Sequence, residues 1–142
     1  MSVNSDPGAE TKSMSLDLSF YRDFFQLSPD GYVIFDDKGL IIDVNTAAIS
    51  LYKYARTEFL VKTAADIIFG KSMSMFEQFK AEVRSKGSYF NETVDHDSAG
   101  RIFSAEVSGI RMMADGNEYF VSIIKDITER KRVIEKLEYM AH

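Results

Sequence analysis

Apolar residues recur along the chain first at helical spacing and then in alternation. The helical set comprises Leu16, Phe20, Phe24 and Leu27. It predicts an N-terminal amphipathic helix over residues 16–28. This helix ends where Ser28 precedes Pro29, because a proline drives the preceding residue out of helical geometry. The small and polar residues 1–15, which include Pro7-Gly8, predict a flexible leader.

Alternating or β-branched runs further on predict five strands. They span residues 32–35, 40–44, 88–95, 102–113 and 118–125. Asp115-Gly116 is a strong hairpin signal between the last two. Asn45 is placed to cap a helix over 46–54. Ser74, with a glutamate three residues on, predicts the start of another helix that ends at Gly87. This order predicts an α+β fold, a five-stranded antiparallel sheet with helices on one face.

The last strand passes into a charged helix with almost no loop. Asp126-Ile127-Thr128-Glu129-Arg130 marks the junction, where Asp126 is placed to cap the helix over 127–142. Such a stiff joint would pass a strain in the sheet on to the helix, so Asp126, Thr128 and Glu129 are predicted signal-relay residues. Heptad-like apolar spacing along the helix favours a short coiled coil, and the alternative is a solvated terminal helix.

The composition is that of one globular domain without basic character. The chain has 142 residues, of which 45% are hydrophobic and 13% aromatic. Its net charge of −5 argues against nucleic acid as a partner, because phosphate binding needs a basic face. No apolar run could span a bilayer and the N-terminus lacks the apolar core of a signal peptide, so we expect a cytoplasmic domain without direct membrane contact.

The ordered set of motifs resembles the PAS domain family. The matching stretches are Pro29-Asp30-Gly31, Asp36-Asp37-Lys38-Gly39, Val44-Asn45-Thr46-Ala47-Ala48, Tyr54-Ala55-Arg56-Thr57-Glu58-Phe59-Leu60, Gly100-Arg101 and Asp126-Ile127-Thr128-Glu129-Arg130. The resemblance covers residues 20–130, with a PAS core over 29–126. It implies a sensory or dimerisation module and not an enzyme. Such domains bind a small molecule between the inner sheet face and the helices, act on an effector through the terminal helix, and commonly dimerise.

The lack of cysteine removes two kinds of PAS chemistry. A flavin photoadduct of the LOV kind and the chromophore of the photoactive yellow type both need a Cys, so we expect no covalent flavin adduct. Haem would need an axial His, which the helix over 74–86 lacks. Met73 and Met75 lie nearby, but Met at helical spacing favours core packing, so haem is not expected.

We expect neither a metal site nor catalysis. His96 lies between Asp95 and Asp97, but neighbours in a strand point to opposite faces, which is poor geometry for a metal. The chain shows no nucleophile with a paired acid and base, and no Gly-rich phosphate loop.

What remains is a pocket for a small, mostly apolar organic ligand, or no ligand at all. The period-two alternation and the inward residues of the helices give the predicted pocket, which comprises Val33, Phe35, Asn45, Met73, Phe76, Phe79, Thr93, Phe103, Ala105, Val107, Phe120, Ser122 and Ile124. Ala105, Gly109 and Ser122 are small and could leave space. Asn45, Thr93 or Ser122 would orient a ligand. The alternative is that Phe and Met side chains fill the space, giving a ligand-free dimerisation and relay module.

The opposite sheet face carries apolar residues that need a cover. Either the N-terminal helix lies on its own sheet, or two copies of the chain pack through helix and sheet. We favour a homodimer, whose interface residues would be Leu16, Phe20, Phe24, Leu27, Tyr119, Val121 and Ile123.

The last residues point to an effector in the parent protein. Lys136-Leu137-Glu138-Tyr139-Met140-Ala141-His142 resembles the linker before GGDEF diguanylate cyclase domains, which are often paired with EAL phosphodiesterase domains. The resemblance implies a piece of a bacterial cyclic-di-GMP signalling protein, with a sensor histidine kinase as the alternative. The cyclase motif itself is absent from the sequence, so no catalytic activity is expected of this chain.

Overall fold

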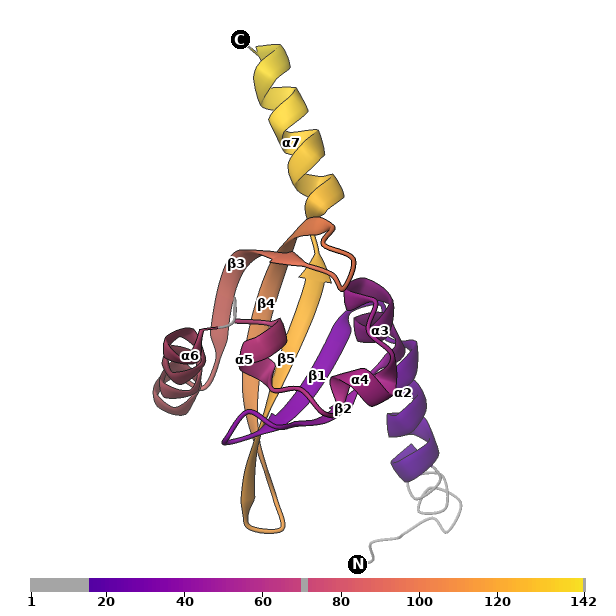
Figure 1. Cartoon of the computed structure of the whole chain (residues 1–142), viewed down its shortest axis with the longest axis vertical. Helices are drawn as coiled ribbons and strands as arrows, with labels where there is room; N and C mark the ends of the chain where they lie inside the picture. Colours follow the sequence, from indigo (N-terminus) through magenta and orange to yellow (C-terminus); the bar gives the residue numbers. More distant parts are fainter. Residues whose placement is uncertain (1–15, 70–71, 142) are drawn as a thin grey trace, which may run out of the picture.

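Five antiparallel strands form one sheet in the order β2-β1-β5-β4-β3. The computed structural model describes residues 16–69 and 72–141 (Figure 1). The strands are β1 (Gly31–Asp36), β2 (Ile41–Val44), β3 (Tyr89–His96), β4 (Ile102–Ala114) and β5 (Asn117–Asp126). The helices are η1 (Leu16–Phe20, a π-helical turn), α2 (Tyr21–Leu27), α3 (Thr46–Tyr52), α4 (Arg56–Phe59), α5 (Ala64–Ile67), α6 (Met73–Lys86) and α7 (Thr128–Ala141). The predicted α+β fold is confirmed, and the predicted leader over 1–15 lies outside the described residues.

Local sequence signals set most of the element ends. The Asp115-Gly116 turn has both residues at positive φ, 51° and 77°, as the favoured two-residue hairpin turn requires. The start of α6 differs from the prediction. The helix begins at Met73, because the hydroxyl of Ser72 accepts a hydrogen bond from the backbone N–H of Met75 at 3.2 Å and caps it. Ser74 therefore lies inside the first turn.

β5 lies at the centre of the sheet, between β1 and β4. Phe35 of β1 is opposite Phe120 of β5, and Gly31 is opposite Ile124. On the other side of β5, Val107 of β4 pairs with the same Ile124. The first and last strands of the domain are therefore neighbours, and β1 begins where β5 ends.

Helices α3 to α6 all cover one face of the sheet (Figure 1). The side chains that alternate toward them are buried, which places the core between the two layers; from the strands they include Val33, Phe35, Phe103, Ala105, Val107, Phe120 and Ile124. Burial of one Phe or Val side chain stabilises the fold by roughly 1.5–3 kcal/mol. An ion pair also holds α6 to the sheet, because Arg84 Nη2 lies 2.6 Å from Glu118 Oε1 of β5.

The N-terminal helix lies beside α3 and leaves its apolar stripe uncovered. α2 contacts α3 (Figure 1), and the ring of Phe25 packs 5.8 Å from that of Tyr32 at the start of β1. Phe20, Phe24 and Leu27 remain 46%, 59% and 80% exposed. The side chain of Leu16 lies outside the described part of the structure. On the outer face of β5, Val121 is buried, whereas Tyr119 and Ile123 are half-buried.

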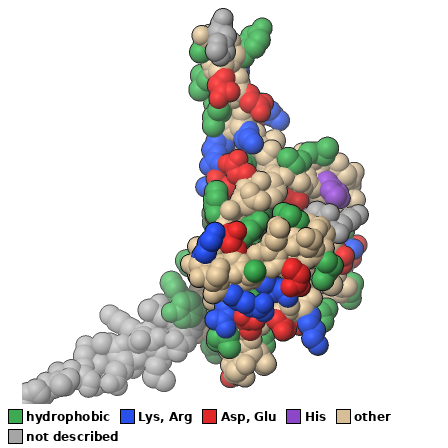
Figure 2. Space-filling view, turned by 90° about the vertical axis from the view of Figure 1, so that its left-hand side faces the viewer, with side chains coloured by type: hydrophobic (Ala, Val, Ile, Leu, Met, Phe, Trp, Pro, Cys, Tyr) green, Lys and Arg blue, Asp and Glu red, His purple; other side chains and the backbone are tan. Residues whose placement is uncertain are grey.

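α7 stands clear of the rest of the molecule. It continues from the end of β5 and projects along the long axis (Figure 1). Acidic and basic side chains alternate along it with apolar ones (Figure 2). The apolar residues, which include Val133, Ile134, Leu137 and Met140, are exposed. Within one copy of the chain, most of α7 therefore packs against no other described element.

Candidate functional site

Aromatic rings fill the centre of the inner sheet face. The ring of Phe79 lies directly over Gly109, where even a Cβ atom would clash with it. The same ring lies 5.6 Å from Phe35, 6.0 Å from Phe120 and 4.9 Å from Tyr89, measured between centroids. Phe79 thus takes up the space that the small residue at position 109 was predicted to leave.

A cavity of about 250 Å³ lies instead toward the edge strand β3. Its walls come from the end of α5, the first turn of α6, and strands β3 and β4. The lining residues are Ile68, Phe69, Ser72, Met75, Tyr89, Thr93, Val94, Asp95 and Val107. We call this the β3 cavity. Of the predicted pocket residues, Thr93 and Val107 border it.

The other predicted pocket residues lie elsewhere. Met73 is 58% exposed, on the solvent side of α6. The remainder are buried in the core without lining the β3 cavity; they are Val33, Phe35, Asn45, Phe76, Phe79, Phe103, Ala105, Phe120, Ser122 and Ile124. The hydroxyl oxygen of Ser122 is buried and has no hydrogen-bond partner among the described residues.

A buried carboxyl group forms the polar wall of the β3 cavity. Asp95 is 5% exposed, and its Oδ2 accepts a hydrogen bond of 2.8 Å from the hydroxyl of Tyr52 in α3. Burial raises the pKa of the Asp95 carboxyl to about 6, although the Tyr52 hydrogen bond and the neighbouring His96 partly oppose the rise. Burial also raises the pKa of Tyr52 well above its ordinary value, and the charge of Asp95 adds to this. The pair therefore keeps its proton on the phenol and its negative charge on Asp95 at neutral pH.

The sequence signal that identifies Asp95 is the alternation in β3. Asp95 pairs in register with Phe103, whose side chain is buried in the core. The step of two residues from Thr93 to Asp95 therefore places both on the inner face. Asp95 is the last residue of the strand predicted over 88–95, but its burial could not be predicted, because its partner Tyr52 lies on the distant helix α3.

Asp97, two residues on, shapes the turn between β3 and β4. Its Oδ1 accepts hydrogen bonds of 2.9 Å from the backbone N–H groups of Ala99 and Arg101, and its Oδ2 lies 3.6 Å from Lys53 Nζ. Burial opposes ionisation, but these partners hold the pKa of Asp97 below its ordinary value. The backbone N–H of Ser98 also donates to the carbonyl of Tyr52 at 2.8 Å. The turn is thus fixed to the end of α3, which supplies the hydroxyl that holds Asp95.

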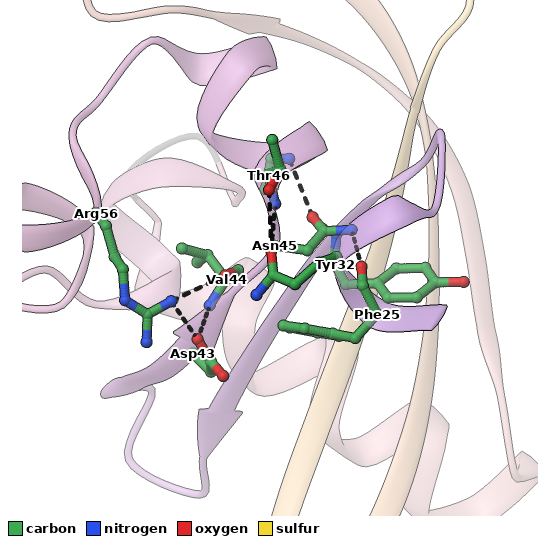
Figure 3. A network of polar contacts seen from close by, with 9 residues as sticks. Phe25, Tyr32, Asp43, Val44, Asn45, Thr46 and Arg56 are labelled. Atoms are coloured by element: carbon green, nitrogen blue, oxygen red, sulfur yellow. Dashed lines mark hydrogen bonds and ion pairs between the residues drawn. The ribbon is translucent and has the colours of Figure 1, made fainter. Parts of the chain in front are cut away.

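The Asn45 side chain is fully used in joining three elements. Its Oδ1 accepts from the backbone N–H of Tyr32 at 2.8 Å and from that of Ala48 at 3.0 Å, which caps α3 as predicted. Its Nδ2 donates to the carbonyls of Phe25 and Asp30, both at 2.9 Å. Figure 3 shows Asn45 between α2, β1 and α3. With both donors and both acceptor positions engaged, Asn45 has no free group with which to orient a ligand.

Two further polar contacts support the same region. Gln26 Oε1 of α2 accepts from the backbone N–H of Thr46 at 3.1 Å, so α2 contributes to the cap of α3. Arg56 Nη1 donates to Asp43 Oδ1 at 2.6 Å and to the carbonyl of Val44 at 3.2 Å (Figure 3). The N-terminal helix is therefore connected to the domain by polar groups, while its apolar stripe stays exposed.

The joint between β5 and α7 is held by the residues that begin the helix. Asp126 Oδ1 accepts from the backbone N–H of Thr128 at 2.9 Å, and Thr128 Oγ1 accepts from the backbone N–H of Ser104 in β4 at 3.0 Å. The N–H of Ile127 donates to the carbonyl of Ser104 at 2.8 Å. Although partial burial opposes it, hydrogen bonds from Thr128 and the charge of Arg101 hold the pKa of Asp126 below its ordinary value.

Basic residues of α7, rather than Glu129, reach the sheet. Arg130 Nη2 lies 2.6 Å from Glu106 of β4 and 3.6 Å from Glu92 of β3. Lys131 Nζ lies 3.7 Å from the same Glu92. Glu129 pairs with Arg132 within the helix. The sequence does not predict the contacts of Arg130 and Lys131, because a charged residue on a helix is normally expected to face solvent.

Two other features, a metal-binding cluster and a membrane-spanning helix, are absent from the described residues. No group of three or more His, Asp or Glu residues within 16–69 and 72–141 is arranged to hold a metal ion. None of the helices described there is long and apolar enough to cross a membrane.

Comparison with known proteins identifies the fold. The PAS domain family matches residues 29–129. No curated protein matches the chain. Among solved structures, the PAS domain of a protein from Colwellia psychrerythraea is 21% identical, with a TM-score of 0.71 over 79% of this chain and 98% of that one.

Two further structures agree. The PAS domain of an HTR-like protein from Haloarcula marismortui is 21% identical, with a TM-score of 0.71 over 84% of this chain and 99% of its own. A domain of the sensory box sensor histidine kinase/response regulator from Geobacter sulfurreducens is 25% identical, with a TM-score of 0.70 over 82% of this chain and 99% of its own.

Proposed function

Because the chain belongs to the PAS domain family, we propose that it is a sensory module that binds a small ligand in the β3 cavity and signals through α7. The single observation that carries the proposal is the position of β3. Thr93 and Asp95 of this strand border the cavity. Glu92, the residue before Thr93, points to the opposite face of the sheet and pairs with Arg130 and Lys131 of α7. A ligand that moves the strand therefore acts on both sides of the sheet at once.

The β5–α7 joint supplies the stiffness that such a relay needs. Asp126 and Thr128 are bonded to each other and to β4 within one turn of the helix start. A displacement of β3 and β4 would thus tilt or rotate α7 instead of being absorbed in a loop. Asp126 and Thr128 keep their proposed relay role, and Arg130 joins them in the proposal.

The output acts on a C-terminal effector in a homodimer. The exposed stripe of Phe20, Phe24 and Leu27 and the exposed apolar residues of α7 support pairing of two copies. The chain-end resemblance to linkers of GGDEF proteins supports a diguanylate cyclase or phosphodiesterase as the effector. The alternative is a histidine kinase, which the 25% identity with the Geobacter sulfurreducens domain favours.

A second candidate function is a ligand-free dimerisation and relay module. The ring of Phe79 over Gly109 favours it, because the centre of the inner face has no space left. In this case the β3 cavity would be a packing defect without a signal.

A cavity-filling variant separates the two functions. Val107→Phe adds bulk to a wall of the β3 cavity, and the matched change Met113→Phe adds it at an exposed position of the same strand. We expect Val107→Phe, once shown by circular dichroism to be folded, to abolish the response of the full-length parent protein to its signal. The Met113 variant tests for effects of a larger side chain away from the cavity. A parent protein that responds normally with a folded, filled cavity would support the ligand-free module and refute the sensory proposal.

A further inference from the structure

The walls of the β3 cavity differ in polarity, and this difference indicates what kind of ligand fits. Resting on the sensory function proposed above, we propose that the cavity takes a small protonated organic amine. Its ammonium group would lie against the carboxylate of Asp95, and its apolar part against Ile68, Phe69 and Met75.

The charge of the cavity wall favours a cation. Asp95 is buried, yet among the described residues no Lys or Arg lies within ion-pair distance of it. The acidic neighbour Asp97 does have a basic partner, Lys53. Buried charges in proteins are normally paired, because an unpaired one has lost its hydration without compensation. A ligand ammonium would supply the missing counter-charge.

The hydrogen bonds of Asp95 leave one oxygen for the ligand. Tyr52 donates to Oδ2, and no described residue donates to Oδ1. Thr93, on the same wall, has a buried hydroxyl oxygen without a partner. An ammonium group has three donors and no acceptor, and it suits a wall whose unsatisfied atoms are oxygens. A carboxylate or phosphate ligand would instead face the charge of Asp95 at close range.

The other walls limit the size of the ligand and favour an apolar remainder. A cavity of about 250 Å³ holds roughly eight waters at about 30 Å³ each, so a ligand of up to about ten non-hydrogen atoms fits. The lining residues Ile68, Met75 and Val107 offer only apolar contacts. The ring of Tyr89, which also lines the cavity, would add a cation–π attraction where it lies beside the ammonium group.

Isothermal titration calorimetry on the full chain tests the charge preference directly. The probes are arylalkyl and alkyl amines, each with the alcohol of the same skeleton as its neutral partner; phenethylamine and 2-phenylethanol form one such pair. We expect at least one amine to bind about tenfold or more tightly than its alcohol at neutral pH. The proposal is overturned if every alcohol binds as well as its amine, or if no amine binds.

An isosteric variant locates the preference. Asp95→Asn removes the charge but keeps an oxygen that can accept from Tyr52, and Asp115→Asn makes the same change at the exposed β4–β5 turn. We expect the amine preference to disappear in Asp95→Asn and to persist in Asp115→Asn. Retention of the preference in Asp95→Asn would refute the assignment to this carboxylate. Binding of alcohols or acids without any amine preference would sink this inference alone, whereas a cavity that binds no probe of any charge would count against the sensory function as well.

Discussion

Glu92 of β3 lies 3.6 Å from Arg130 of α7, so the strand that borders the cavity is joined directly to the helix that leaves the domain. Glu106 of β4 shares the same guanidinium at 2.6 Å. The two carboxylates come from adjacent strands and face away from the cavity. Arg130 therefore bridges β3 and β4, and in the proposed relay it would respond to a change in their spacing.

The first prediction concerns this contact. Glu92→Gln should change the free energy of unfolding by less than about 1 kcal/mol, because exposed ion pairs contribute little. It should nevertheless raise the hydrogen-exchange rate of the first turn of α7, which loses an anchor. Glu129→Gln is the matched control, since among the described residues Glu129 pairs with Arg132 of its own helix. Equal exchange rates in both variants would show that the Glu92 contact does not hold α7.

The second prediction concerns the packing of Phe79 on Gly109. Gly109→Ala should destabilise the domain by about 1–3 kcal/mol, because the added methyl group overlaps the ring. In a chain that already carries Phe79→Leu, the change Gly109→Ala should cost less free energy of unfolding, because the smaller side chain leaves room for the added methyl group. Urea unfolding of the two single variants and the double variant gives the coupling between the sites. Additive effects would contradict the contact.

The third prediction is a dependence of stability on pH that comes from Asp95. Its pKa is raised from 3.8 to about 6 in the folded chain, so the folded state holds the proton more tightly than the unfolded state. The contribution of Asp95 to the free energy of unfolding is therefore fully present below about pH 4, and it is lost as the pH rises through about 6. Asp95→Asn should remove that slope and stabilise the domain at pH 8 by at most about 3 kcal/mol.

Asp97→Asn in the adjoining turn is the control, and it should destabilise the domain at neutral pH, whereas Asp95→Asn should stabilise it. The pKa of Asp97 is lowered by its partners, so loss of the carboxylate removes favourable contacts at neutral pH. The charged groups near Asp95 are His96 beside it and the Lys53–Asp97 pair. His96→Gln is a second control, because it changes the side chain beside Asp95 and leaves the carboxyl group in place. A wild-type slope that survives Asp95→Asn unchanged would assign the effect to another group.

The fourth prediction concerns the exposed stripe of α2. Phe24→Glu should convert a homodimer into monomers at concentrations where the parent sequence is dimeric, because a buried charge would enter the interface. Val61→Glu changes another exposed apolar side chain on a different element and should leave the dimer intact. Sedimentation equilibrium measures both. A folded Phe24→Glu chain with an unchanged dimer would remove the stripe from the interface.

The sequence predicts the framework well where one residue type has a single physical use. Asn45 caps α3 because its side chain has the length and the acceptor that the cap needs. Asp115-Gly116 forms its turn because both residues tolerate positive φ. The alternation in β4 places Phe103, Ala105 and Val107 on the buried face. These are local rules, and distant parts of the chain do not change them.

The site is less predictable because its residues depend on packing between distant elements. A small residue at position 109 indicates space, and only the direction of Phe79 from α6 shows that the space is filled. Asp95 ends a predicted strand, and only its contact with Tyr52 of α3 shows that its carboxyl group is buried and held there. The contacts of Arg130 depend on where α7 leaves the sheet. In each case the deciding partner lies on another element.

The pairing of Gly31 with Ile124 has a consequence for how such a domain can be carried in a larger protein. The chain enters the sheet at the point where it leaves it, so α2 and α7 attach close to one another along the same strand pair. A module with a shared entrance and exit can be spliced between two helical segments, duplicated in tandem or deleted, with little change in the separation of the flanking segments.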